Sequence, residues 1–547
     1  MNKKLSRVLI YIPILWFVFG FVLYPLVNTI ISGFSADGTF SFENYISFIG
    51  SANGLHIIGN TLILGIATVI VCGFIGTALA LFVSMADIKG KKFLNTLLLT
   101  PIMVPGVLIV LAFIQLYGES GMITKILAPF LHFGGIKGFW GILFIHAYTQ
   151  YVYFYMNVSA TMESLDYSQI EAAQSMGASR SRILRKIILP YIRPALLSSS
   201  IVTFMSGISS FSAPNLLGGY KVLSTQIMYS KINNRLDIAS MQVTLMLMMG
   251  VLVMMTLRYF EEKASFQNSL KGTSFKPIPV SSPLGKVCKV LVWAVAVSII
   301  APIICVILLS FAESSDIMTS IVPSDFTLEN YRAIFSRRRV LKPFINSLNM
   351  TLIAVFASLA ITLPTAYLAV KRKNKVSHLL ELAVMLPMAI PVGSIAINLI
   401  NAFNKKNIFT FGQPLIGTFI ILPIAYVLLT MPMLLRSNII AMEKFNTDLE
   451  YSARSLGASS TQTFLRVTLR QVLPFVISGA VIAYVRTFGE YTVSAFLYGV
   501  HNKPVSIAMV NALQEYDIGL SMAYGTLTVG VCFIGVLLTQ LIEKHFN

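Results

Sequence analysis

Two charged side chains lie four residues apart inside an otherwise apolar run in the last third of the chain. Arg486 and Glu490 occupy the segment 472–498, and a spacing of four places two side chains on one face of a helix. A lone charge in such a segment is costly, so we expect the two groups to offset each other as a pair. The corresponding positions in the first half are the neutral Ser206 and Ser210. Two interpretations remain open: a structural ion pair, or a polar face that lines a path through the protein.

No other group of residues has a spacing that points to catalysis. The sequence contains no Walker A phosphate-binding motif and no set of His and Cys residues at metal-ligand spacing. His146 stands alone near several tyrosines, which favours a hydrogen-bonded core residue over a ligand. The four cysteines lie in or beside apolar runs. We therefore expect no catalytic residue, no metal site and no cofactor bound by this chain.

A polar, basic stretch from Thr161 to Pro194 separates two apolar runs and contains the sequence EAAQSMGAS at residues 171–179. Its first residues suit a helix, Gly177 suits the left-handed position after a helix end, and Ser179 can cap a second helix. A related sequence, YSARSLGAS, occupies residues 451–459. We call 171–179 the first elbow and 451–459 the second elbow. Their shared positions are Ala173/Ala453, Ser175/Ser455, Gly177/Gly457, Ala178/Ala458 and Ser179/Ser459.

The first elbow, together with Leu189-Pro190 beyond it, resembles the "EAA" loop of ABC importer permeases. In that family the loop forms a coupling helix that docks into a groove of the ATP-binding subunit. The second elbow departs from the pattern: Tyr451 stands in the place of Glu171, and Arg470 in the place of Pro190. We therefore predict unequal coupling by the two elbows. The residues that the resemblance assigns to coupling are Glu171, Ala172, Ala173, Gly177, Ala178, Ser179, Ala453, Gly457, Ala458 and Ser459.

The composition is that of a polytopic membrane protein. Of 547 residues, 56% are hydrophobic and only 12% are charged, whereas soluble domains carry about 25% charged residues. The net charge of +19 comes from Lys and Arg scattered in short loops between apolar runs, as the positive-inside rule predicts. The sequence contains no basic–aromatic array. We therefore expect this chain to lie in the lipid bilayer and not to bind nucleic acid.

Apolar runs of the length that a bilayer requires predict twelve spans, with both termini on the cytoplasmic side because most basic loops then face inward. One basic segment, 337–342, would lie on the outer side and disagrees with this topology. The twelve predicted spans are 8–31, 57–86, 93–117, 140–162, 191–216, 241–260, 286–311, 344–370, 378–402, 410–435, 472–498 and 522–543.

The chain repeats itself over nearly its whole length. Phe40–Tyr45 matches Phe326–Tyr331, and the pair Pro101/Pro105 matches Pro387/Pro391 at the same offset of about 286 residues. Six spans in each half give both halves the same orientation. We therefore predict an all-α polytopic membrane protein with two parallel-repeat halves, and the resemblance implies the fold of a type I ABC importer. The predicted units are a first transmembrane domain (1–260), a cytoplasmic linker (261–285) and a second transmembrane domain (286–547).

The resemblance implies a fused permease subunit in the cytoplasmic (inner) membrane. Its expected partners are two copies of an ABC ATPase, which would carry ATP and Mg, and an extracytoplasmic binding protein that delivers the solute. A secondary transporter of the major facilitator type is the alternative, although loop 86–92 lacks that family's motif. The segments 210–214 and 488–491 look closest to the ferric-iron, phosphonate and polyamine group. Ferric iron is the favoured solute, with thiamine, 2-aminoethylphosphonate and polyamines as alternatives.

Overall fold

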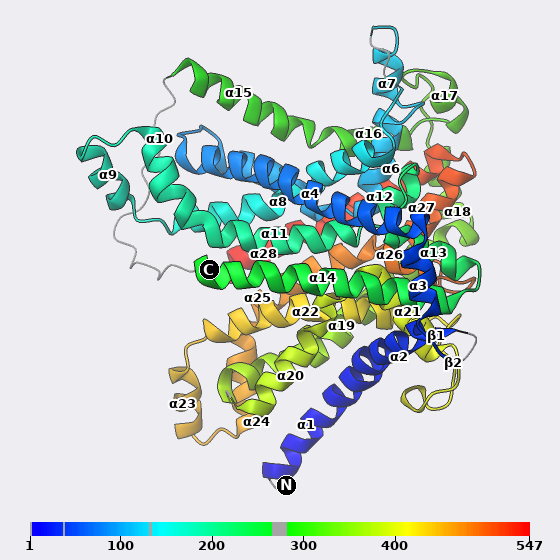
Figure 1. Ribbon diagram of the computed structural model, residues 1–547. Helices are drawn as coiled ribbons and strands as arrows, with labels where there is room; N and C mark the ends of the chain where they lie inside the picture. The colour runs from blue at the N-terminus through cyan, green and yellow to red at the C-terminus, as the bar shows by residue number, and fades with distance from the viewer. Residues whose placement is uncertain (1–2, 37–38, 131–133, 265–281, 373, 547) are drawn as a thin grey trace.

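The computed structural model describes residues 3–36, 39–130, 134–264, 282–372 and 374–546, which form a bundle of long helices (Figure 1). The predicted linker 261–285 therefore lies mostly outside the described residues. A short antiparallel hairpin, β1 (Ser35–Ala36) and β2 (Thr39–Phe40), pairs Ser35 with Phe40.

The first half contains the following helices in chain order, where η marks a 3₁₀ or π turn: α1 (Lys3–Val18), η1 (Phe19–Leu23), α2 (Tyr24–Gly33), α3 (Glu43–Gly50), α4 (Ala52–Met85), α5 (Lys91–Leu99), η2 (Thr100–Met103), α6 (Gly106–Tyr117), α7 (Met122–Leu127), α8 (Gly138–Glu163), α9 (Tyr167–Ser175), α10 (Arg180–Ile183), η3 (Leu184–Ile188), α11 (Leu189–Ile208), α12 (Ser212–Leu217), α13 (Leu223–Ile232) and α14 (Leu236–Ala264).

The second half repeats this series almost helix for helix. Its elements are α15 (Pro283–Ser298), α16 (Ala301–Ser310), α17 (Ser314–Thr319), α18 (Glu329–Ser336), α19 (Arg338–Arg372), α20 (Lys375–Met385), η4 (Leu386–Ala389), α21 (Val392–Phe403), η5 (Ile408–Thr410), α22 (Ile421–Glu443), α23 (Asp448–Ser455), α24 (Ser460–Thr463), η6 (Phe464–Thr468), α25 (Leu469–Phe488), α26 (Thr492–Leu497), α27 (Val505–Gln514) and α28 (Ile518–Phe546).

Ten of the described helical segments are long and apolar enough to cross a membrane, or eleven if the bent pair Lys375–Ala389 and Val392–Phe403 counts as one span. By the criteria of length and apolar composition, the described helices therefore give fewer membrane spans than the twelve predicted. The missing member is α8, the fourth predicted span. It has 26 residues, enough for about 39 Å at 1.5 Å per residue. Polar side chains such as His146 and Gln150 lower its hydropathy.

The two halves interlock through their first helices. α2 of the first half packs on α21 of the second, and α16 of the second half packs on α6 of the first. Asn401 on α21 anchors one of these contacts, because its Nδ2 lies 2.7 Å from Ser240 Oγ and 3.1 Å from Thr29 Oγ1. Its carbonyl oxygen accepts from Asn28 Nδ2 at 3.0 Å. Amide hydrogen bonds of this kind hold helices together where apolar packing gains little over lipid.

The two ends of the bundle are different. In Figure 1, α9, α10, α23 and α24 lie at the left, the C-terminus lies on the same side and the N-terminus lies at the bottom, whereas β1, β2, α3, α13 and α18 lie at the right. The basic segment 337–342, which disagreed with the predicted topology, joins α18 to the start of α19, so the structure also places it at the end opposite the elbows.

Candidate functional site

A cavity of about 940 Å³ lies between the two halves. Its walls come from α6, α8, α11 and α14 of the first half, and from η4, α22, α25 and the start of α26 in the second. Because both halves contribute, a relative movement of the halves would change the shape of this cavity.

The repeated proline pairs, Pro101/Pro105 and Pro387/Pro391, break the helices at the cavity wall. After η2 the chain becomes extended at Val104 (ψ 134°), and after η4 it does so at Ile390 (ψ 125°). Pro101, Pro105 and Pro391 all line the cavity. Gly489 approaches Pro105 across the boundary between halves so closely that a Cβ on it would lie 2.4 Å from the proline ring. The prolines therefore shape the cavity, beyond merely kinking a packed helix.

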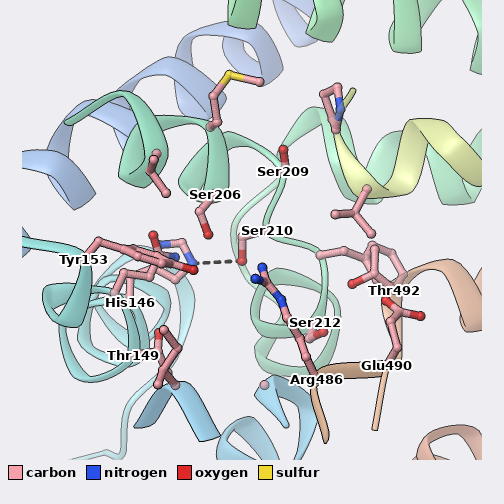
Figure 2. A pocket seen from close by; sticks show the side chains of 18 of the residues that line it. His146, Thr149, Tyr153, Ser206, Ser209, Ser210, Ser212, Arg486, Glu490 and Thr492 are labelled. Carbon is pink, nitrogen blue, oxygen red and sulfur yellow. Dashed lines mark hydrogen bonds between the residues drawn. The ribbon is translucent and has the colours of Figure 1, made fainter. Parts of the chain in front are cut away.

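The first-half wall is rich in hydroxyl groups (Figure 2). His146, only 2% exposed, is hydrogen-bonded on both ring nitrogens: Nδ1 lies 2.8 Å from Thr68 Oγ1, and Nε2 lies 2.8 Å from Ser210 Oγ. The prediction of a hydrogen-bonded core residue is thus confirmed. His146 also lines the cavity, which the sequence analysis missed; the available signal was a polar, titratable side chain within a predicted span.

The predicted pair of Arg486 and Glu490 is not formed. Among the described residues no ion pair joins them, because α25 ends at Phe488 and the two side chains no longer share a helix face. Instead, the Glu490 carboxylate accepts from the N–H groups of Val493 and Ser494, each at 3.1 Å, and from Ser494 Oγ at 3.2 Å. Both Arg486 and Glu490 line the cavity, and the alternative interpretation, a polar face along a path, stays a prediction.

Three further charged residues line the cavity and were missed in the sequence. Arg258, Glu261 and Arg436 lie in α14 and α22, and the signal was a charge within a predicted span or one residue past its end. Within the described parts of the chain, no group of three His, Cys, Asp or Glu side chains is placed to hold a metal ion.

Both elbows have the predicted helix–glycine–helix backbone. α9 ends just before Gly177 (φ +75°), and Ser179 Oγ accepts from Arg182 N–H at 3.4 Å at the start of α10. In the second elbow, Gly457 has φ +86°, and Ser459 Oγ accepts from Gln462 N–H at 3.3 Å. No atom lies within 4 Å of a Cβ added to either glycine, so the left-handed backbone alone requires glycine there.

Each elbow leads without interruption into a helix that reaches the cavity. From the first elbow, α10, η3 and α11 run to Ile208, and Ser206 near the far end of α11 lines the cavity. From the second, α24, η6 and α25 run to Phe488, and Arg486 near that end lines the opposite wall. A displacement of an elbow would therefore be transmitted along one helix to the cavity.

The helix that leads into the second elbow carries a buried charge. Glu450 on α23 is 7% exposed. Its carboxylate accepts from Thr468 Oγ1 at 2.7 Å and lies 3.4 Å from Lys371 Nζ at the end of α19. The Lys371 ammonium also lies 4.9 Å from the centre of the Phe445 ring.

Comparison with known proteins identifies the class to which this architecture belongs. The family "Binding-protein-dependent transport system inner membrane component" matches the chain twice, over residues 74–265 and 358–547. The chain belongs to this family. Each match lies in one half and includes its elbow and its main cavity-lining helices, so the permease is a fused repeat, and the major facilitator alternative is set aside.

Individual relatives agree with this assignment. A probable ABC transporter permease of Sinorhizobium fredii is 31% identical, with 98% of this chain and 97% of the relative covered. A ferric transport system permease of Actinobacillus pleuropneumoniae is 24% identical over 96% of this chain and 77% of its own length. A spermidine/putrescine permease of Escherichia coli is 22% identical over 38% of this chain and 78% of its own. A solved bacterial alginate importer covers 49% of the permease and 100% of the matched chain, at 15% identity and a TM-score of 0.37.

Proposed function

We propose that this permease forms the translocation pathway of an ATP-driven importer. Two ATPase subunits would dock on the first and second elbows and hydrolyse ATP with bound Mg. This chain would then need no catalytic residue and no cofactor of its own. An extracytoplasmic binding protein would deliver the solute at the opposite end. The elbow end, with both termini, would then face the cytoplasm across the inner membrane.

The observation that carries this proposal is the continuous path from each elbow to the cavity. The elbows lie at the same end of the bundle (Figure 1), and α11 and α25 connect them to opposite walls of one cavity. A coupling device needs such an element, since ATP binding on one side must change the access of a site elsewhere. The assigned coupling residues, from Glu171 to Ser179 and from Ala453 to Ser459, lie at the start of these paths.

We propose ferric iron as the solute. The support is the likeness to the ferric permease of Actinobacillus pleuropneumoniae, which extends over 96% of this chain and 77% of that permease. Thiamine, 2-aminoethylphosphonate and polyamines stay as alternatives. The solute is tested by purifying the binding protein encoded beside this permease and measuring which of these compounds it binds.

The docking role is tested at Gly177. A valine there resists the positive φ, whereas asparagine tolerates it, and the open space around the position means that neither side chain clashes. We expect Gly177→Val to weaken co-purification of the ATPase and to abolish ATP-driven uptake into proteoliposomes. Gly177→Asn is the matched control and should retain most of both. Equal behaviour of the two variants would contradict the role of the elbow.

A further inference from the structure

The charges that line the cavity do not balance. Three arginines and two glutamates face it, namely Arg258, Arg436, Arg486, Glu261 and Glu490. In the described part of the chain, none of the three arginines takes part in an ion pair. Arg258 and Arg436 lie on α14 and α22, both of which end on the elbow side, where basic residues are expected in any case. Arg486 has no such explanation, because it lies near the end of α25 that is farthest from the second elbow.

The Arg486 side chain is exposed to the cavity. Figure 2 shows its guanidinium group reaching from α25 into the space between the halves, on the side of Ser210. A guanidinium group presents five N–H donors in a planar fork that matches the geometry of a carboxylate or a phosphate. Its counterpart in the first half is Ser206, so the charge is not a requirement of the repeated fold.

Glu490 does not neutralise this arginine by contact. Each of its carboxylate oxygens already accepts at least one hydrogen bond from the first turn of α26, through the N–H groups of Val493 and Ser494 and the hydroxyl of Ser494. The carboxylate is thereby held on its own side of the cavity, and Figure 2 shows it apart from the guanidinium group of Arg486.

The facing wall offers neutral groups that can donate to an anion. Ser206, Ser209 and Ser212 line the cavity with Thr149 and Tyr153, and their hydroxyl groups donate or accept as required. Arg486 faces a set of hydroxyl donors, and the Glu490 carboxylate beside it is already engaged by α26, so this part of the cavity favours a negatively charged ligand. A trivalent metal ion without ligands, or a polyamine, would meet three arginines on entry.

We propose that Arg486 binds an oxyanion group of the transported solute inside this cavity. The inference rests on the proposed transport function and narrows the substrate class to anions. The shared chemistry is a carboxylate, phosphate or phosphonate. It comes either from a free organic anion or from the ligand of an anionic ferric chelate, in which case iron crosses as the chelate.

The experiment measures binding to the full-length permease in nanodiscs by equilibrium dialysis. The probes are labelled inorganic phosphate, citrate, ferric citrate and spermidine. We expect saturable binding of the anionic probes and none of spermidine. Arg486→Gln should weaken anion binding about tenfold or more, as loss of a charge-assisted hydrogen bond predicts. Arg486→Lys keeps the positive charge but not the planar fork of donors, and it should lose less anion affinity than Arg486→Gln does. Lys375→Gln, exposed at the start of α20 and outside the cavity, is the matched control and should bind as the wild type.

The two sources of the oxyanion give different results. Preference for ferric citrate over citrate identifies the chelate, and equal binding identifies the free anion. The proposal is overturned if the wild type binds no anionic probe, if spermidine binds in preference, or if Arg486→Gln binds the anions as well as the wild type does. The binding measurement uses the permease without an ATPase. A failure of ATP-driven uptake would therefore count against the proposed function, whereas the result on anion binding would still stand.

Discussion

Helix α9, which leads into the first elbow, rests on apolar side chains, whereas α23, which leads into the second, is held by a buried ion pair. In the first half, Ile170 is 2% exposed and Ile188 is 1% exposed, and both belong to one apolar cluster. Met85 packs against that cluster, and it occupies the position that corresponds to Lys371 in the second half. Contact of this kind depends on buried area and not on direction.

In the second half the same positions are polar. Glu450 takes the place of Ile170, and Thr468 takes the place of Ile188. Glu450 accepts a hydrogen bond from Thr468 and forms an ion pair with Lys371 beneath α23. A shift of either Glu450 or Lys371 leaves a charge buried without compensation.

The comparison separates two properties of an elbow. Its backbone is set locally, because a glycine with positive φ and a capping serine recur in both copies. Its attachment to the bundle is set by distant residues, and the two halves have reached that attachment by different chemistry. Exchanging the attachments, while leaving the elbows unchanged, tests whether the difference matters.

The largest effect is expected from Ile170→Glu, which places a carboxylate in the apolar cluster with no cation at position 85. Burial of an unpaired charge should destabilise this region by about 3–5 kcal/mol. Hydrogen exchange of α9 and the melting temperature of the purified permease measure the change. Ile170→Val is the matched control and should cost only about 0.5–1.5 kcal/mol. Partial recovery in the variant that also carries Met85→Lys would show that the ionic attachment can be transplanted.

The reverse exchange, Glu450→Ile, should cost about 3 kcal/mol, because it leaves the Lys371 ammonium buried without its carboxylate. Adding Lys371→Met removes that charge and recreates the apolar pair of the first half, so most of the stability should return. The melting temperature and hydrogen exchange of α23 are the measurements. If the double variant is no more stable than Glu450→Ile alone, the buried pair is not what holds the second elbow.

Features that depend on short stretches of sequence could be predicted for this protein, whereas contacts between distant residues could not. The repeat, the family resemblance and both elbow backbones were readable, since they depend on residue identity over short spans. The pairing of Arg486 with Glu490 was predicted wrongly, because the spacing argument assumed that the helix continued past Phe488. The partners of Glu450 lie 79 and 18 residues away on Lys371 and Thr468, and no spacing rule joins them.

The smallest change in stability is expected at the elbow position occupied by Glu171 in the first half and by Tyr451 in the second. We expect substitutions there to affect coupling and not folding. Glu171 on α9 is exposed, and its counterpart Tyr451 on α23 is 66% exposed. Replacing either with alanine should change the free energy of unfolding by less than about 0.5 kcal/mol, as is usual for surface sites.

The proposed docking predicts a difference in function between these two variants. A carboxylate at a docking surface steers a basic partner and pairs with it, so Glu171→Ala should lower the amount of solute transported per ATP hydrolysed more than Tyr451→Ala does. Glu171→Gln, which keeps the shape of the side chain, should resemble Glu171→Ala if charge is the cause. The loss at Glu171 should also shrink at high salt, because screening already weakens that pair in the wild type. Equal losses at the two positions, or a larger loss at Tyr451, would show that the two elbows couple alike despite their different sequences.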